Sequence, residues 1–473
     1  MDFSWQYVAY SVGLAVVLIL LWSTIGDCNG PLTPEVADEV ASRVLNQQAG
    51  NGGNSGDINV YVDRSLSMKP YLSSPQESDL YRLTTRLGDL VATSTDFYGF
   101  GFETMKAEEQ SVEAISPVKL KSQGTYSFAN NDYGTLFQSF SDTTETHLVI
   151  SDGVQSDPKT GPSLRKVLSA IDQWVRSGGT FATLLYRTPY RGQYYSDQPG
   201  PDPQYSCEDR PLTVFVLGQS PSAVDNLLQR FGSELEPDHV VRLGDDPLLI
   251  SPAPRGLAKE NRRGAQILQE MKKFQLSKYD QVFKASVAAG AATANGFLPF
   301  QLEVSLDRST FPWRVLDKEE TETFLRGLET KVRVSALDQE KMESINESQT
   351  RRAAVGPISP QANGDSTLLR PADVQTRKAQ IETVNVGSDS VTARFTVPMR
   401  KPTAKLKTPY YSILIRFGVE PQAARMLVPD GYSTTNDLNP DHCDRIYKLR
   451  RLVGSIMYRS YVPGQALVLA EWL

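Results

Sequence analysis

The chain has 473 residues, too long for one average domain, and this length predicts two or three domains. Hydrophobic residues make up 40% and charged residues 22% of the chain, which excludes a disordered or fibrous protein. The formal net charge of -6, without a long basic run, argues against nucleic-acid binding.

The N-terminal segment predicts a membrane anchor. No charged side chain occurs from Phe3 to Gly26, and about 20 apolar residues are enough to cross a bilayer. Trp5 and Trp22 flank the run, as interfacial aromatic residues do. A cleaved signal peptide is the competing interpretation, which the lack of Lys or Arg before the run weakens. We expect residues 1–30 to be an uncleaved transmembrane anchor, with the globular part outside the cytoplasm.

Residues 31–56 predict a short helix followed by a flexible linker. Thr33 is the expected helix cap and Pro34 the first helical residue. The stretch from Ala49 to Gly56 consists mostly of glycine and asparagine, which is typical of flexible linkers.

The most informative part of the chain is Ile58 to Met68, with the sequence Ile-Asn-Val-Tyr-Val-Asp-Arg-Ser-Leu-Ser-Met. An apolar strand is expected to end at Asp63, and Ser65 and Ser67 follow at alternate positions. In an extended segment alternate side chains point the same way, so three oxygen donors can converge. Such donors suit Mg²⁺. Alone the motif is weak, because serines after a strand are also ordinary turn formers.

Two further segments strengthen this interpretation. A second apolar run ends in Ser151-Asp152-Gly153, and a turn between the two runs contains Thr135. Over residues 57–250, the order and spacing of these residues resemble the metal-ion-dependent adhesion site of von Willebrand factor type A domains, the fold also found in integrin I domains. The resemblance implies an Mg²⁺ site, with Mn²⁺ or Ca²⁺ as alternatives. Its ligands would be Asp63, Ser65, Ser67, Thr135 and Asp152.

The resemblance also implies how the site works. In the family the hydroxyls ligate the ion and the aspartates bind largely through water, so the ion stays electrophilic. We therefore expect a protein partner to supply an Asp or Glu side chain. An enzyme is not expected, since the sequence has neither a Gly-x-Ser-x-Gly elbow nor a Gly-x4-Gly-Lys-Ser/Thr phosphate loop. The alternatives are a cytoplasm-facing adaptor for an AAA+ ATPase and a structural domain with an unused metal site.

Within residues 57–250 expected strands and helices alternate, which predicts an α/β fold with a doubly wound, mostly parallel sheet. Residues 187–211 interrupt this alternation with a Tyr- and Pro-rich segment. Long loops of this composition are often functional, so we expect either a recognition loop or a mobile insertion.

Residues 251–473 predict a β-rich second domain. Alternating or β-branched runs predict strands, a basic helix is expected over Asp441–Tyr458, and a charged helix over Gly256–Leu276. Residues 338–376 are polar, and their composition predicts disorder. The expected strands are Pro299–Leu306, Lys331–Leu337, Gln380–Val386, Val391–Val397 and Tyr410–Phe417.

The three cysteines are Cys28, Cys207 and Cys443. One disulfide, between Cys207 and Cys443, is possible in an oxidising compartment, and three free thiols are the alternative. The run Asp441-His442-Cys443-Asp444 is a weak candidate for a transition metal, because it lacks a second His/Cys pair at ligand spacing. His147, which opens an expected strand, is predicted to be a structural surface residue.

Overall fold

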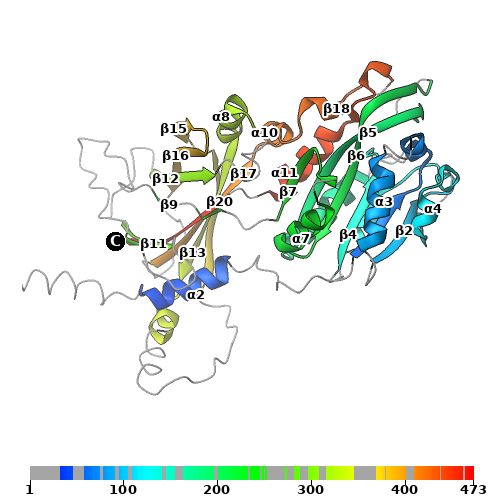
Figure 1. The fold of residues 1–473 in the computed structure, drawn as a ribbon. Coiled ribbons are helices and arrows are strands. Elements are labelled where there is room, and N and C mark those ends of the chain that lie inside the picture. Colours follow the sequence, from blue (N-terminus) through cyan, green and yellow to red (C-terminus); the bar gives the residue numbers. More distant parts are fainter. Residues whose placement is uncertain are drawn as a thin grey trace, which may run out of the picture.

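The structure is a computed structural model, and its described parts form two bodies connected by an arm (Figure 1). The description covers residues 32–45, 58–74, 78–90, 95–104, 109–140, 145–154, 163–195, 201–232, 235–244, 248–249, 251–252, 272–273, 282–287, 297–307, 316–345, 369–378, 380–400, 410–436, 438–461 and 464–472.

A seven-stranded mixed sheet in the order β3-β2-β1-β4-β6-β5-β7 forms the centre of the first body. β1 pairs in parallel with β2 and with β4, and the remaining pairs are antiparallel. The predicted α/β class is confirmed, with the parallel pairs of this sheet lying among β2, β1 and β4. Its strands are β1 (Ile58–Asp63), β2 (Thr95–Gly101), β3 (Ser111–Ala114), β4 (Thr146–Ser151), β5 (Thr180–Gln193), β6 (Gln204–Gly218) and β7 (His239–Leu243).

Helices pack on this sheet, and local sequence explains where they begin and end. The Asp132 and Ser220 side chains accept hydrogen bonds from the first turns of α5 and α7. Gly232 follows α7 at a φ of 69°, which glycine adopts without a Cβ clash. Figure 1 shows α3 and α7 in front of the sheet. The helices are η2 (Leu66–Leu72), α3 (Asp79–Leu90), α4 (Pro117–Leu120), η3 (Gln123–Thr125), α5 (Tyr133–Gln138), α6 (Ser163–Arg176) and α7 (Pro221–Phe231).

β5 and β6 continue beyond the sheet as a long hairpin. It occupies the segment for which we predicted an irregular loop, and its strands stay paired as far as Gln193 and Gln204. The loop prediction for residues 187–211 was therefore wrong for most of that segment. Pro189 is tolerated because it falls at the register shift between Thr188 and Tyr190, where the ladder is already interrupted.

Two sheets form the second body, whose strand-rich character agrees with the sequence patterns. Phe395 on β16 and Phe417 on β17 pack across the two sheets, with ring centroids 5.2 Å apart. The larger sheet contains β10 (Lys272–Lys273), β11 (Val282–Val287), β20 (Gly464–Trp472), β17 (Tyr410–Val419), β13 (Leu328–Leu337) and β14 (Leu369–Lys378), with β8 (Leu248–Leu249) beside β20. The smaller contains β15 (Gln380–Val386), β16 (Ser390–Arg400), β12 (Phe297–Asp307) and β9 (Ser251–Pro252). α8 (Lys318–Arg326) precedes β13.

Two predictions for this half need correction. The polar segment 338–376 is partly regular, because residues 339–345 are helical and β14 covers its end. The charged helix over Gly256–Leu276 lies mostly outside the described residues, and the two that are described there, Lys272 and Lys273, form β10. All five expected strands are confirmed.

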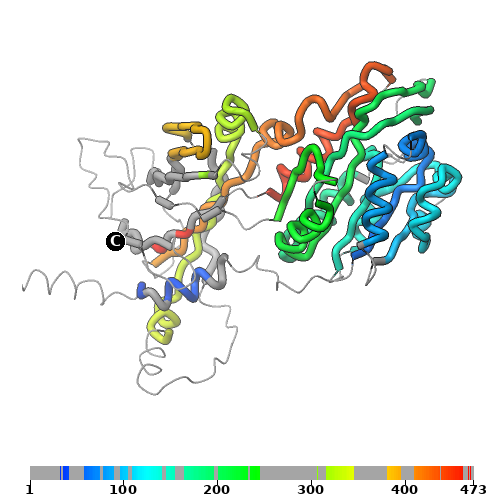
Figure 2. The backbone as a smooth tube through the Cα atoms, viewed as in Figure 1, coloured from blue at the N-terminus to red at the C-terminus, as the bar shows by residue number. Residues whose placement is uncertain are grey.

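Between β17 and β20 the chain leaves the second body and packs on the first; we call residues 421–461 the arm. Figure 2 shows this part of the chain, in orange and red, reaching the hairpin. The predicted helix over Asp441–Tyr458 begins only at Leu449, since Lys448 adopts a left-handed conformation with a φ of 57°. The arm contains α10 (Pro421–Met426), η5 (Asp430–Tyr432), β18 (Ser433–Thr434), η6 (Pro440–His442), β19 (Ile446–Tyr447) and α11 (Leu449–Ser460).

Covalent and polar contacts hold the arm on the first body. Cys207 on β6 and Cys443 in the arm form a disulfide, which decides between the two alternatives left open by the sequence. On α6, Asp172 forms ion pairs with Arg176 of the same helix at 3.0 Å and with Arg459 of α11 at 3.3 Å. The arm therefore connects the two bodies. Its ends continue into β17 and β20 of the second body, and its side chains bind β6 and α6 of the first.

The predicted short helix is present as α2 (Pro34–Leu45) and packs on the second body. Its buried residues Val36 and Val40 belong to one apolar cluster with Leu414 and Leu467 of that body. The expected anchor, residues 1–30, lies outside the described residues. None of the helices in the described ranges is long and apolar enough to span a membrane.

Candidate metal centre

β1 and β4 bring two aspartates to one edge of the first sheet. Asp63 is the last residue of β1 and Asp152 directly follows β4. These strands are parallel neighbours, and Val62 is paired with Ile150, so both carboxylates emerge at the same strand ends. Ligand sites of α/β sheets lie at this carboxyl edge.

Asp63 is completely buried and accepts hydrogen bonds from three directions. Its Oδ1 accepts from the backbone N–H of Ser65 at 2.8 Å. Its Oδ2 accepts from Ser151 Oγ at 2.7 Å and from Asn131 Nδ2 at 2.6 Å. These bonds fix the carboxylate in one orientation at the end of β1.

The serine hydroxyls connect Asp63 to Asp152. Ser151 Oγ, which donates to Asp63, also lies 3.4 Å from Asp152 Oδ1, and Ser65 Oγ lies 2.9 Å from Ser67 Oγ. Asp152 Oδ1 also accepts from the backbone N–H of Val154 at 3.0 Å. The structure thus brings four of the predicted site residues together in one hydrogen-bonded network.

Thr135, the remaining predicted residue, lies exposed on α5, outside this network. Its hydroxyl donates to Asp132 Oδ2 at 2.7 Å and accepts from Lys166 Nζ at 3.4 Å. Since Asp132 follows Asn131, which donates to Asp63, the start of α5 is still connected to the site. In the described structure none of the hydrogen bonds of Thr135 reaches the four residues of the network.

The sequence interpretation missed three residues of the site. Ser151 stands next to Asp152, and Asn131 lies four residues before Thr135 in the same predicted turn, so both positions were available from the sequence as a signal. Ser151 also hydrogen-bonds to the buried hydroxyl of Tyr133. Arg210, on β6, acts electrostatically on Asp152 and has no comparable local signal.

Ionising both buried carboxyl groups of the site costs free energy when no cation is bound. Burial and the nearby charge of Asp152 raise the pKa of Asp63 to about 7. Burial likewise raises the pKa of Asp152, against the opposing effects of its hydrogen bonds and of Arg210. A divalent ion would remove this penalty, because it favours the ionised form of both carboxylates.

The donors present fit an oxygen-binding ion such as Mg²⁺. Asn131 Oδ1 is buried beside Asp63 and accepts no hydrogen bond from the residues that the structure describes, so it is an acceptor oxygen that an ion could use. The hydroxyls and carboxylates are hard ligands of the kind Mg²⁺ prefers. Across the described ranges, no three His, Cys, Asp or Glu side chains gather as a possible metal site, and here only two carboxylates meet.

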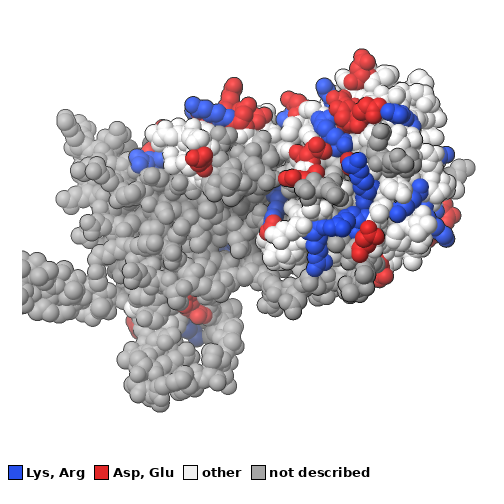
Figure 3. All heavy atoms as spheres, viewed as in Figure 1, with Lys and Arg blue, Asp and Glu red and all other residues white. Residues whose placement is uncertain are grey.

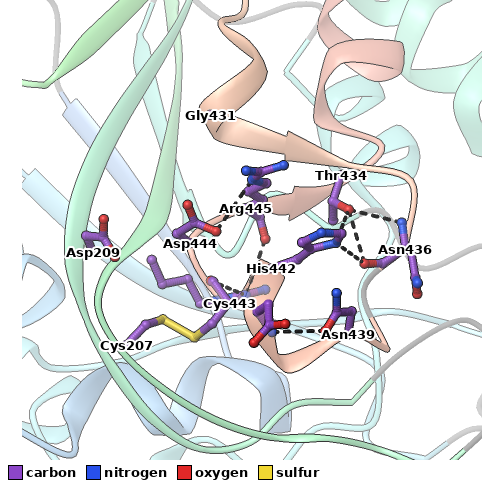
Figure 4. A network of polar contacts seen from close by, with 12 residues as sticks. Cys207, Asp209, Gly431, Thr434, Asn436, Asn439, His442, Cys443, Asp444 and Arg445 are labelled. Atoms are coloured by element: carbon purple, nitrogen blue, oxygen red, sulfur yellow. Dashed lines mark hydrogen bonds and ion pairs between the residues drawn. A yellow bond between two sulfur atoms is a disulfide. The ribbon is translucent and has the colours of Figure 1, made fainter.

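The second metal candidate, Asp441-His442-Cys443-Asp444, is not supported. The Cys443 sulfur is used in the disulfide. His442 Nδ1 lies 3.0 Å from Thr434 Oγ1 and 2.9 Å from the Asn436 carbonyl oxygen (Figure 4). The segment is therefore a structural turn of the arm.

Searches of protein-family models, curated proteins and solved structures found no match to this chain.

Proposed function

We propose that the chain is a membrane-anchored, divalent-metal-dependent protein-interaction module that binds an acidic residue of a partner. The observation that carries the proposal is the meeting of Asp63 and Asp152, both buried, through the Ser151 hydroxyl, with the bonded hydroxyls of Ser65 and Ser67 directly after Asp63. These residues, together with Thr135, would hold Mg²⁺ or a similar ion. The bound ion would supply a positive centre for a partner's carboxylate.

The surroundings of the site support a protein partner. The hairpin lies against η2, where the Tyr190 hydroxyl donates to the Ser67 carbonyl at 3.1 Å. Tyr195, near the end of the hairpin, is 39% exposed. Exposed tyrosines are favoured in protein interfaces. In Figure 3, Lys and Arg on the first body alternate with Asp and Glu, which favours a protein over a nucleic acid.

The Cys207–Cys443 disulfide favours export of the globular part. Disulfides persist in oxidising compartments and are rare in the cytoplasm. This observation supports a tethered receptor or assembly factor over a cytoplasmic adaptor for an AAA+ ATPase.

Orientation can be tested by labelling in intact cells. A cysteine introduced as Asn54→Cys, in a Cys28→Ser background, should react with a thiol reagent that cannot cross membranes. Labelling only after lysis would reverse the orientation and restore the adaptor alternative.

The metal-dependent contact can be tested by capturing the partner from cells. Thr135→Ala removes a proposed metal ligand and EDTA removes the metal, so each should weaken capture of the partner. The variant should still fold, because the exposed Thr135 hydroxyl contributes little to the core. Ser139→Ala is the matched control, since it removes an exposed hydroxyl from the other end of α5. Equal capture in EDTA and by Thr135→Ala would exclude the mechanism, and a site that binds no metal would support the structural-domain alternative.

A further inference from the structure

Arg210 is a fully buried arginine within a cage of tyrosine rings. Its guanidinium carbon lies 4.7 Å from the ring centroid of Tyr190, 4.5 Å from that of Tyr194 and 5.1 Å from that of Tyr205. Ring faces attract cations, and this attraction strengthens when water is excluded. The hairpin thus holds a positive charge at a defined place.

Only part of this guanidinium is hydrogen-bonded. Nη1 donates to the carbonyl oxygen of Cys443 at 2.9 Å, whereas the buried Nε and Nη2 donate to no acceptor among the described residues. A buried charge is expensive unless an opposite charge compensates for it. The carboxylate of Asp152 supplies an opposite charge that acts on Arg210 electrostatically.

The strand register places Arg210 towards the turn that contains Asp152. β6 is antiparallel to β4, and Ser151 is paired with Thr213. The residues of β6 that precede Thr213, including Arg210, extend beyond the end of β4. They therefore run towards the turn that contains Asp152. The arm closes the same turn, because a Cβ on Gly153 would lie 3.1 Å from Ile446 Cδ1.

We propose that Arg210 is a positioning residue that serves as the internal counter-ion of Asp152 and competes with the bound metal for its charge. This inference rests on the proposed metal site. The guanidinium cannot leave its cage when the ion binds, so the two cations repel each other across Asp152. The repulsion lowers the affinity for the free ion. An anionic partner ligand relieves it, which makes metal and partner binding mutually reinforcing.

The experiment measures Mg²⁺ affinity of the full chain in detergent by calorimetry. Arg210→Met and Arg210→Gln remove the charge, and Gln keeps a donor for the Cys443 carbonyl. Either should bind Mg²⁺ about tenfold more tightly than the wild type, the order of magnitude of one charge repulsion in a protein interior. Arg210→Lys keeps the charge and should retain the wild-type affinity.

Arg187→Met is the matched control. Arg187 also lies on the hairpin, stacks on Tyr432 of the arm at 4.3 Å and donates to the Gly431 carbonyl at 3.3 Å. Its loss should leave Mg²⁺ affinity unchanged. A purely structural role of Arg210 predicts weaker binding in both neutral variants, so the sign of the change decides.

The outcomes are distinguishable. If the wild type binds Mg²⁺ and neither folded neutral variant binds it more tightly, only the counter-ion role is wrong. If the wild type binds no divalent ion, the proposed metal site fails and this inference fails with it. Circular dichroism identifies which variants fold, and Gln is the conservative choice if Met disrupts the cage.

Discussion

The hydroxyl of Tyr190 donates to the backbone carbonyl of Ser67, so the hairpin is bonded directly to the loop that carries the candidate metal ligands. A partner that approaches this loop therefore meets the hairpin as well. The Tyr190 ring also packs on η2, because it forms an edge-to-face pair with Tyr71 at a centroid distance of 4.8 Å.

Tyr190→Phe should lower the free energy of unfolding by about 1 kcal/mol, the usual net value of one hydrogen bond. The measurement is denaturant unfolding followed by near-ultraviolet circular dichroism. Tyr195→Phe is the control, because Tyr195 is partly exposed on the same hairpin. Equal losses in the two variants would show that the bond to Ser67 contributes nothing particular.

Asp63→Asn should abolish Mg²⁺ binding and change how the stability of the metal-free protein depends on pH. The folded pKa of Asp63, about 7, lies above its ordinary value, so the folded state holds a proton that the unfolded state has released. Wild-type stability should therefore fall as pH rises from about 4 to about 7. In EDTA, melting temperatures of Asp63→Asn should show less of this decline, and parallel curves would contradict the assignment.

His147→Phe should reduce the loss of stability in acid. His147 was predicted to lie at the surface, but it is buried and stacked on Phe140 with a centroid distance of 4.1 Å. Burial lowers its pKa to about 4, so the unfolded state binds a proton first as pH falls. Stability from this group is present above about pH 6.5 and is lost towards pH 4. The difference in melting temperature between wild type and variant should shift across this window, and a constant difference would refute the prediction.

Replacing both cysteines, by Cys207→Ser and Cys443→Ser, should free the arm from the hairpin. Loss of a native disulfide typically costs about 2 to 5 kcal/mol. Limited proteolysis should cleave residues 421–461 sooner in this variant than in the wild type, and reduction of the wild type should have the same effect. Cys28→Ser should not accelerate cleavage. Unchanged cleavage in the double variant would mean that the ion pairs of Asp172 suffice to hold the arm.

How far the sequence predicts this molecule depends on how local each signal is. The meeting of Asp63 and Asp152 follows from strand ends and hydroxyl spacing, which short segments encode. The hairpin was not predicted because the prolines of residues 187–211 are typical of loops. The sequence does not indicate that Pro189 falls at a register shift, where a strand tolerates it. Arg210 could not be assigned, because its cage and its bond to Cys443 come from segments far apart in the chain.

The docking of α2 on the second body determines how a pulling force would pass through the protein. If the chain is anchored at its N-terminus and a partner holds the metal face, tension between them enters the second body first. From there the chain leads to the first body at three places: residues 46–57, the connection between β8 and β7, and the arm. The connection from β7 (His239–Leu243) to β8 (Leu248–Leu249) has only four residues, which is too short to extend far under tension. The Cys207–Cys443 bond ties the arm to β6, so tension that passes through the arm would reach the first body at the disulfide.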